Sequence, residues 1–549
     1  MAMRKTLAEV MDRIGEQQAE RSPHESAWRD IMSLMMPFRG DVTTKSEGGA
    51  RIEGVIDSTA GGAAQDFISW IKGQVAPTQM SWIHFMAHED LRDDIFVTQL
   101  LDRGASKVLR ALSESNFYLQ LEAYLRDLIL PGNGISYGQE IHKRVNPRTG
   151  STFGKMNFKS VPFFDMWWTY GIDDQPIWTT REFTLPAGAA YEFFKGKPGK
   201  RVLDAMGNGE LFRKFKYYNC IIKNENGIPG GLKLPEDRAW HSVWVCDDGP
   251  EFAGELEGFD WNPYVVSRLK IAQDHTYGYG HGHAIRPDTK AANSLKGKEL
   301  VAVAKNANPK LMYDANSIEP KTLSGGSGGA IVIKNPTHSR PEYLESRTDF
   351  AATHAIRQNE QEAIRKALMA DVISNPDTQP RSAQESALRE VRGLRRMGGD
   401  ADAVFHALSP IIENVASTMQ AAGELPEFDL IAEQVPGAKF EIRFVSPFFT
   451  AQNQGDLGQV DAYLDRLRVM ALETENQEYM DRVSPDKISA YYARAGNVPA
   501  EILNTEEEML EVREARAAAA ARQQQLDQIQ QAASAAKDVA QVEGAQAGA

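Results

Sequence analysis

The spacing of apolar residues changes at about residue 131, and this change constrains the fold more than any other feature of the sequence. Before it, apolar side chains recur every three or four residues, as in helices that bury one face. The turn-forming sequence Pro131-Gly132-Asn133-Gly134 ends this pattern. Short apolar segments separated by Gly, Pro and Asn follow it, to about residue 270. Helices followed by a mostly antiparallel sheet predict an α+β protein.

The individual elements follow from the same patterns. Asp57 or Ser58 is expected to cap the second of four N-terminal helices. The expected helices are one closed by Pro37, one from about 57 to 77, one from about 90 to 112 and one that ends before 131. The expected strands are 135–143, 155–161, 164–170, 177–185, 215–223, 239–246 and 264–271, with a short helix at about 187–194. Residues 146–150 and 173–174 are the predicted turns of two hairpins.

A lysine-rich helix is predicted at 288–307, and it stands out because the chain as a whole has a formal net charge of −14. Only Asp288 and Glu299 oppose its positive charges, which suggests a surface held near a polyanion. Two of the lysines, Lys298 and Lys305, lie within about 20° of each other around the helix axis, because seven residues make almost two turns. Ordinary solvated charge is the competing interpretation. The lysines of this segment are Lys290, Lys296, Lys298, Lys305 and Lys310.

The second half is predicted to be mainly helical. A Gly-rich β segment (323–334) precedes a helix at about 343–370, and a loop with two prolines (374–380) ends that helix. Ser382 and Glu385 form a capping box for a helix that ends at Gly423. A strand at 439–445, a helix at 456–472 and a C-terminal helix with approximate heptads complete the chain. This last helix begins at a second capping box, Thr505 with Glu508, and residues 544–549 are expected to be disordered.

Several kinds of chemistry lack the residues they need. The Gly-rich segment is not followed by the Lys and Ser/Thr of a phosphate-binding loop. His275, His281 and His283 could bind a metal, but a flexible turn is the favoured interpretation because no second cluster supplies further ligands. Adjacent acids such as Asp93-Asp94 and Asp247-Asp248 do not make a two-metal site. We therefore expect no catalytic residues, no cofactor and no metal.

Other features bear on the protein's surroundings. Cys220 and Cys246 are expected to be buried, reduced thiols, as in a reducing cytosol. The first ten residues have no apolar core of a signal peptide. No run of about 18 apolar residues is present, so no contact with a membrane is expected.

Short motifs occur in a defined order along nearly the whole chain. They are Trp28 with Pro37, Asp57-Ser58-Thr59-Ala60, Pro77-Thr78, Ser81-Trp82, Ser115-Asn116-Phe117, Gly132-Asn133-Gly134, Arg181, Tyr277-Gly278-Tyr279-Gly280, Pro309, and Ser382-Ala383-Gln384-Glu385 with Arg389. In this order they resemble the head-to-tail connector (portal) proteins of podovirus-type tailed bacteriophages. Ser382, Gln384 and Asn133 depart from the residues that are usual in that family.

The resemblance implies a portal fold, with a β-rich wing, long stem helices and a C-terminal barrel helix. Its divisions are the wing at 1–287 (helical to 134, β-rich from 135), stem helices at 288–307 and 343–371, a clip at 308–342, a tunnel loop at 372–381, crown-side helices at 382–425, a wing or crown return at 426–504, and the barrel helix and tail at 505–549.

The resemblance also implies a function. About twelve copies would form a ring at one vertex of the capsid, assembled in the cytoplasm of a bacterial host and retained in the virion. Double-stranded DNA would be packaged through the ring by a separate terminase and would later leave through it. A capsid or scaffold protein and a tail adaptor would be further partners. The implied DNA-channel candidates are Lys290, Lys296, Lys298, Lys305, Asn375, Asp377, Gln379 and Arg381, and the candidates for partner docking on the clip are Gly325, Gly326, Ser327 and Gly328.

Two alternatives remain at this point. One is a different structural oligomer of a phage, such as a scaffold or tail component, in which the C-terminal helix drives assembly. The other, less favoured, is a metal-dependent nuclease, which would require Mg²⁺-dependent turnover that a single carboxylate substitution abolishes.

Overall fold

The fold is taken from a computed structural model of the chain. It describes residues 6–38, 54–78, 80–87, 95–143, 145, 150–227, 234–273, 275–307, 311–312, 342–343, 350–370, 383–434, 440–444, 460–470, 473, 483–495, 504 and 508–526. The chain forms two compact units. Unit 1 comprises Met1–Thr78, Leu112–Arg144 and Gly154–Thr418, and unit 2 comprises Gln79–Ala111, Val145–Phe153 and Met419–Ala549.

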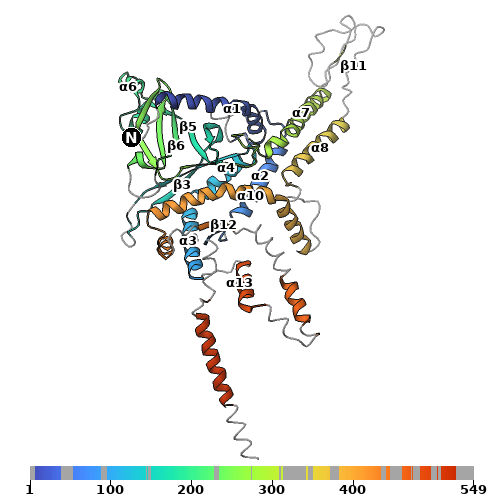
Figure 1. Cartoon of the computed structure of the whole chain (residues 1–549). Helices are drawn as coiled ribbons and strands as arrows, with labels where there is room; N and C mark the ends of the chain where they lie inside the picture. The colour runs from blue at the N-terminus through green and yellow to red at the C-terminus, as the bar shows by residue number, and fades with distance from the viewer. Residues whose placement is uncertain are drawn as a thin grey trace, which may run out of the picture. The chain divides into compact units, whose positions relative to one another are not determined.

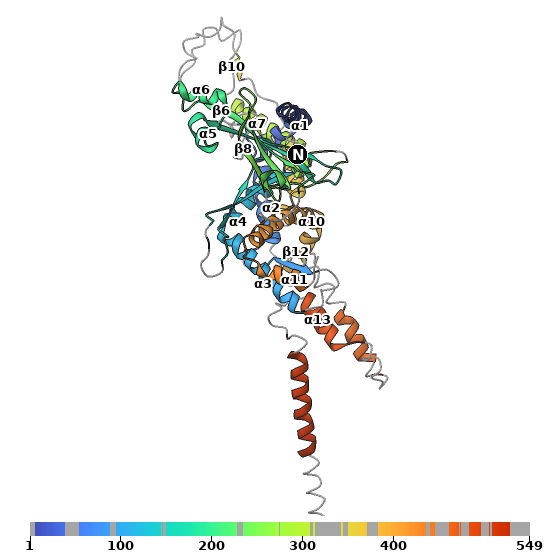
Figure 2. The ribbon, with the colours of Figure 1, turned by 60° about the vertical axis from the view of Figure 1, so that its left-hand side comes forward.

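A five-stranded antiparallel sheet is the largest element of unit 1. Its strand order is β4-β5-β6-β7-β8, so each strand pairs with the next along the chain. The long helix α1 (Leu7–Met35) covers one face, and the short helices α5 (Ala187–Phe193) and α6 (Lys200–Gly207) lie at one end of the sheet in both views (Figures 1 and 2). The strands are β4 (Met166–Tyr170), β5 (Pro176–Pro186), β6 (Lys214–Lys223), β7 (Trp240–Cys246) and β8 (Glu251–Phe259).

The start of α1 explains how this helix is placed on the sheet. Thr6 and Glu9 form a reciprocal capping box, in which the amide of Glu9 donates to Thr6 Oγ1 and the amide of Thr6 donates to Glu9 Oε2. Val10 and Ile14, one turn apart, then pack on the apolar side chains of β5, β6 and β7. Cys220 of β6 lies in this cluster, whereas Cys246 of β7 lies in the cluster under α5 and α6, so the two free, buried thiols are on opposite faces of the sheet.

A second sheet of unit 1 has the strand order β3-β2-β9, in which β2 (Asn133–Ile141) pairs antiparallel with both β3 (Lys155–Ser160) and β9 (Tyr264–Arg268). The helix α4 (Phe117–Ile129) packs against it. A core that includes Trp28, Ile135 and Trp168 joins this sheet, α1 and β4, together with the 3₁₀ turn Phe163–Asp165.

Two glycine-containing turns meet closely beside this core. Gly132 has φ +94°, and a Cβ atom there would lie 2.4 Å from the carbonyl carbon of Tyr279. A Cβ at Gly280 would lie 2.4 Å from the carbonyl oxygens of Ile129 and Leu130. Only glycine allows this approach, which gives both turns a structural role.

Beyond these turns the chain forms a pair of long helices. α7 (His281–Ala307) and α8 (Phe350–Ala367) lie side by side, and both contact the body of unit 1 near α2 (Thr59–Val75) (Figure 1). The short strands β10 (Leu311–Met312) and β11 (Glu342–Tyr343) pair antiparallel beyond the helix ends. The 39-residue helix α10 (Ala383–Ala421) belongs mostly to unit 1.

Unit 2 contains a two-stranded antiparallel sheet, in which β1 (Ile83–Ala87) pairs with β12 (Phe440–Phe444). Most of α3 (Ile95–Glu114) and the whole of α11 (Pro426–Gln434) belong to this unit. An ion pair of 2.6 Å between Lys107 Nζ and Glu427 Oε1 joins these two helices, and Phe428 packs on Phe85. Residues 460–470 and 508–526 and α13 (Pro485–Ala495) are also helical.

The α+β prediction and most of its elements are confirmed, and the differences have local causes. β8 was missed because three glutamates alternate with its apolar residues and Gly254 and Gly258 interrupt it. The first lysine-bearing helix begins at His281 and not after Pro287, since proline is tolerated early in a helix. Tyr343 lies in β11, so the next helix begins only at Phe350. The helices and strands that were not predicted are β1, β8, β10, β11, α6, α11 and α13.

Other predictions fall on residues outside the described ones. They include the Gly-rich segment 323–334, the loop 374–380, the capping residues Ser382 and Thr505, and the tail 544–549. In the part of the chain that the structure covers, no helix is long and apolar enough to cross a lipid bilayer.

Candidate functional site

The four predicted site residues that the structure describes, Lys290, Lys296, Lys298 and Lys305, all lie on α7. This helix and α8 run antiparallel, as the contacts along them show. Glu299 Oε2 accepts from Arg357 Nε at 2.9 Å, while Asn293 and Gln361, earlier on α7 and later on α8, both bond to the segment before α2. The pair is thus fixed in register by polar contacts.

Asp57, which precedes α2, connects all three helices. Its Oδ1 accepts from the amide of Thr59 at 2.9 Å, and its Oδ2 accepts from Gln361 Nε2 at 2.7 Å. Asn293 Oδ1 accepts from the amides of Ile56 and Asp57 at 2.8 and 2.9 Å. Because Asp57 is only 3% exposed, these bonds replace the water that its carboxylate would otherwise need.

The charge of Asp57 is maintained in this setting. Burial by itself would raise the pKa of its carboxyl, but the hydrogen bonds from Thr59 and Gln361 and the charge of Lys296 outweigh burial and hold the pKa below its usual value. Arg357 Nη1 lies 4.0 Å from Asp57 Oδ2, so the same guanidinium neutralises both Asp57 and Glu299. The beginning of α2 is therefore held to α7 and α8 by an ionised acid.

The lysines of α7 have different environments. Lys290 Nζ forms an ion pair with Asp30 of α1 at 2.5 Å, and Lys296 is half-buried near Asp57. Lys298 and Lys305 are exposed, and neither has an acidic partner among the described residues. Of the four lysines predicted to face DNA, Lys290 is thus engaged with α1, and Lys298 and Lys305 are the ones whose charge is available.

The other predicted site residues lie outside the described residues, so their roles stay predictions. They are the loop residues Asn375, Asp377, Gln379 and Arg381, and the glycine-rich residues Gly325, Gly326, Ser327 and Gly328. The β10–β11 ladder pairs Leu311 with Tyr343, which brings the two ends of the intervening segment together.

The histidines before and within α7 differ from the flexible turn that was expected. His281 and His283 are in the first turn of the helix, and His281 Nε2 lies 2.9 Å from Asp400 Oδ2 of α10. His275 Nδ1 lies 2.8 Å from the hydroxyl of Tyr279. No group of three His, Cys, Asp or Glu side chains suited to a metal ion is found among the residues described here.

His283 and His24 belong to an aromatic cluster between α1 and α7. His24 stacks on Trp28 with ring centroids 5.6 Å apart, and Tyr279 lies between His275 and His283. Burial, then the neighbouring charges of Arg286 and His24, lower the pKa of His283 to about 4. Burial and His275 also lower the pKa of His24. These two environments therefore favour the neutral imidazole at His283 and at His24.

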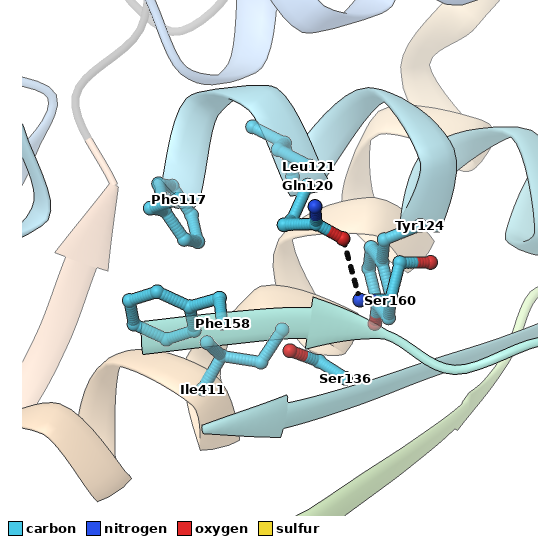
Figure 3. Close-up of a pocket in the computed structure, with 8 residues that line it drawn as sticks. All are labelled: Phe117, Gln120, Leu121, Tyr124, Ser136, Phe158, Ser160 and Ile411. Carbon is cyan, nitrogen blue, oxygen red and sulfur yellow. Dashed lines mark hydrogen bonds between the residues drawn. The ribbon is translucent and has the colours of Figure 1, made fainter. Parts of the chain in front are cut away.

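A small cavity lies between α4, β2, β3 and α10 (Figure 3). Its volume is about 10 Å³, room for roughly one water molecule. The amide of Ser160 donates to Gln120 Oε1 at 2.9 Å across it, as Figure 3 shows. This cavity is too small for a substrate.

Sequence reasoning missed the polar network of Asp57, Asn293, Arg357 and Gln361. Asp57 and Gln361 are 304 positions apart, so no local pattern links them. One signal was available in retrospect: Arg357 and Gln361 are four residues apart and therefore share a face of α8.

The family model described as "Bacteriophage head to tail connecting protein" matches residues 4–503. A search of curated proteins found no match.

Among solved structures, chains of gene transfer agent particles are similar. One, from the "Neck of native GTA particle computed with C12 symmetry", is 12% identical, has a TM-score of 0.35 and aligns over 74% of this chain and 86% of that one. Another, from the "Virion of native gene transfer agent (GTA) particle", is 13% identical, has a TM-score of 0.33 and aligns over 79% and 90%.

Proposed function

This chain belongs to the family of bacteriophage head to tail connecting proteins, and we propose that it is the portal of a tailed, podovirus-type phage. In this proposal about twelve copies close into a ring around an axial channel. The ring occupies one vertex of the capsid, DNA enters through it during packaging, and the same DNA later leaves through it.

The proposed role in conducting DNA is supported by exposed lysines on the helix pair α7 and α8. Lys298 and Lys305 are exposed on α7 without acidic partners among the described residues, on a chain with a net charge of −14. A channel must let DNA slide, and every neutralised phosphate adds salt-dependent affinity. A few lysines repeated around a ring provide weak contact with the DNA backbone that does not depend on base sequence.

The remaining parts have proposed roles by their order along the chain. Residues 1–287 form the wing, 288–307 and 343–371 the stem helices, and 308–342 the clip, which docks first the terminase and then a tail adaptor. The loop 372–381 lines the channel, 382–425 lie on the crown side, 426–504 return to the wing or crown, and 505–549 form the barrel. A capsid or scaffold protein contacts the outside of the ring, and assembly takes place in the host cytoplasm before the ring becomes part of the virion.

The proposal is tested by electron microscopy of the purified full-length protein. Averaged images of negatively stained particles are expected to show rings with a central hole and one rotational symmetry. Particles without a hole, or a chain that stays monomeric under all assembly conditions, would rule out a portal.

One observation also suits a different structural oligomer. Every residue of helix 508–526 except Met509 is exposed, including Leu510, Val512 and Leu526. A helix exposed all round needs partners to be stable, and a scaffold or tail component could assemble through it. The same images separate the two candidates, because only a portal requires the axial hole.

A further inference from the structure

Helix α1 does not cover the whole of its side of the five-stranded sheet. At its start Val10 packs in a cluster with Ile222 of β6 and Val245 of β7. The helix then runs towards β4, where Gln17 Nε2 donates to Thr169 Oγ1 at 3.0 Å. A cavity of about 520 Å³ lies beside Val10, lined by residues of β6, β7 and β8. This volume is within the range of about 300–1,000 Å³ that is usual for ligand sites.

The cavity is elongated along β8, and we call it the β7–β8 groove. Five successive residues of this strand, from Phe252 to Leu256, line it. They span roughly 13 Å, because a strand rises by about 3.3 Å per residue. The register between β7 and β8 shifts between Ser242 and Trp244, so three residues of β8 lie opposite Val243 alone. This bulge widens the space between the two strands and gives the groove room.

The floor of the β7–β8 groove is apolar. Phe252 pairs with Val245 in the ladder, so its side chain is on the side of the sheet that carries the α1 cluster. Phe252 is 40% exposed, and Val243 and Leu256 are half-buried. These side chains continue the apolar surface that α1 covers elsewhere. A ligand with apolar groups would therefore gain by covering them.

The rim of the groove is acidic. The acids among its lining residues are Glu225, Glu236 and Glu255, and the lysine among them is Lys223. Lys223 and Glu255 are each neutralised by an ion pair with a residue that does not line the groove. Glu225 and Glu236 are exposed, and neither has a cationic partner among the residues that the structure describes. Positive charge on a ligand is therefore favoured at this end of the groove.

Hydrogen bonds order the backbone at the acidic end. Asn224 Nδ2 donates to the carbonyls of Glu236 and Arg238 at 3.2 and 2.9 Å. His241 Nε2 lies 3.0 Å from the same carbonyl of Glu236. The turn that carries Glu225 is thus tied to the segment that carries Glu236. Because this backbone is already ordered, binding there has a lower entropic cost.

The edge of β8 is less suited to a ligand than the groove. Gly254, in the middle of the strand, donates its amide to the carbonyl of Lys197 at 2.9 Å. A further strand added at this edge would have to break that bond. The groove on the face of the sheet requires no such change, so an extended ligand is expected there.

We propose that the β7–β8 groove binds a short extended segment of another protein, in which apolar side chains alternate with lysine or arginine. Alternation puts the apolar side chains on one face of such a segment, towards Val243, Phe252 and Leu256. The long basic side chains reach from the other face to the carboxylates of Glu225 and Glu236. The site is independent of the proposed ring and of the proposed DNA channel, because neither requires this groove.

Fluorescence polarisation with the full-length protein tests the proposal. The probe is a short labelled peptide that alternates leucine and lysine. One matched peptide has glutamate in place of lysine, and the other has serine in place of leucine. Saturable binding is expected for the probe, and binding at least about tenfold weaker for each matched peptide, because one lacks the complementary charge and the other lacks the apolar contact.

A variant of the groove floor tests the apolar contact. Phe252→Ser is expected to weaken binding of the leucine–lysine peptide about tenfold, because it removes the most exposed apolar side chain of the floor. Ile172→Ser, at a fully exposed apolar residue in the turn between β4 and β5, is the control and should bind like the unmodified protein. Melting temperatures verify that both variants are folded. If Phe252→Ser is not folded, Leu256→Ser replaces it with the same expectation.

A variant of the rim tests the charge. Glu225→Gln/Glu236→Gln is expected to weaken binding at least about threefold, the scale of two exposed ion pairs. Glu192→Gln/Asp204→Asn removes the same charge at exposed acids of α5 and α6 and should leave binding unchanged.

Three results would overturn the proposal. The first is absence of saturable binding of the leucine–lysine peptide. The second is unchanged binding by the variants of the floor and rim. The third is an equal loss of binding in the α5–α6 control, or equal binding of the serine–lysine peptide, since either would mean general attraction of cations to an acidic chain.

Discussion

Asn133 and Gly278 are joined by two hydrogen bonds that link the first residue of β2 to the turn before α7. The amide of Gly278 donates to Asn133 Oδ1 at 2.8 Å, and Asn133 Nδ2 donates to the carbonyl of Gly278 at 3.3 Å. Asn133 is fully buried. Its side chain thus provides hydrogen-bond partners for both the amide and the carbonyl of a residue 145 positions away.

Asn133→Ala is therefore expected to lower the free energy of unfolding by about 1–3 kcal/mol, because the two backbone groups of Gly278 would be buried without partners. Chemical denaturation monitored by tryptophan fluorescence measures the change. Asn226→Ala, at an exposed turn residue, is the control and should alter stability by less than about 0.5 kcal/mol. Equal effects of the two substitutions would show that the Asn133 bonds do not stabilise the fold.

Gly280→Ala is expected to destabilise the same junction by at least about 1–3 kcal/mol, the usual cost of overpacking. The added methyl group would lie 2.4 Å from two backbone oxygens, which cannot move aside like a flexible side chain. Gly207→Ala, at the end of α6, meets nothing within 4 Å and should be neutral or slightly stabilising. Thermal unfolding of both variants gives the comparison, and a stable Gly280→Ala protein would contradict the close approach.

Asp57→Asn is expected to remove a pH-dependent part of the stability. The folded pKa of Asp57 lies below its usual value of 3.8, so the ionised carboxyl stabilises the fold above about pH 4. That contribution is lost as the pH falls through the lowered folded pKa. The difference in melting temperature between the unmodified protein and the variant should be constant from pH 5 to 7 and shrink below about pH 4. A difference in melting temperature that grows as the pH falls would contradict this role of Asp57.

His283 is a base whereas Asp57 is an acid, but both are expected to make the fold less stable as the pH falls. Its folded pKa of about 4 lies below the usual 6.5, so the unfolded chain binds a proton more readily. Stability is fully present above pH 6.5 and falls as the pH decreases from 6.5 towards 4. His283→Gln should show a shallower loss of melting temperature across this window. An unchanged slope would mean that His283 is solvated.

Lys298→Glu/Lys305→Glu is expected to leave the rings intact and to impair packaging or retention of DNA, because four units of charge change on the surface proposed to face phosphates. Lys200→Glu/Lys214→Glu makes the same charge change at exposed lysines of unit 1 far along the chain from α7, and should package normally. A packaging assay that measures DNA protected from nuclease compares them. Normal packaging by the first variant would remove these lysines from the mechanism.

Local sequence rules predicted the elements better than the contacts between them. The turn residues between β2 and β3 and the apolar spacing of α1, α2 and α4 gave correct elements, because capping and periodicity act over a few residues. Edge strand β8, which contains three glutamates and is interrupted by two glycines, offers no such signal. The site shows the same limit: the lysines of α7 could be found by composition, but the pairing of Lys290 with Asp30 depends on how α1 and α7 pack.

The two buried cysteines lie on opposite faces of the five-stranded sheet, so their reactivity can report when the sheet opens. Burial raises the pKa of Cys220 to about 12 and that of Cys246 as well, so neither thiol forms the reactive thiolate while the sheet is closed. Labelling at these positions can proceed only as fast as β6 and β7 become accessible. The rate of thiol modification, followed by mass spectrometry in subunits and in assembled particles, would therefore measure how much assembly restrains the sheet.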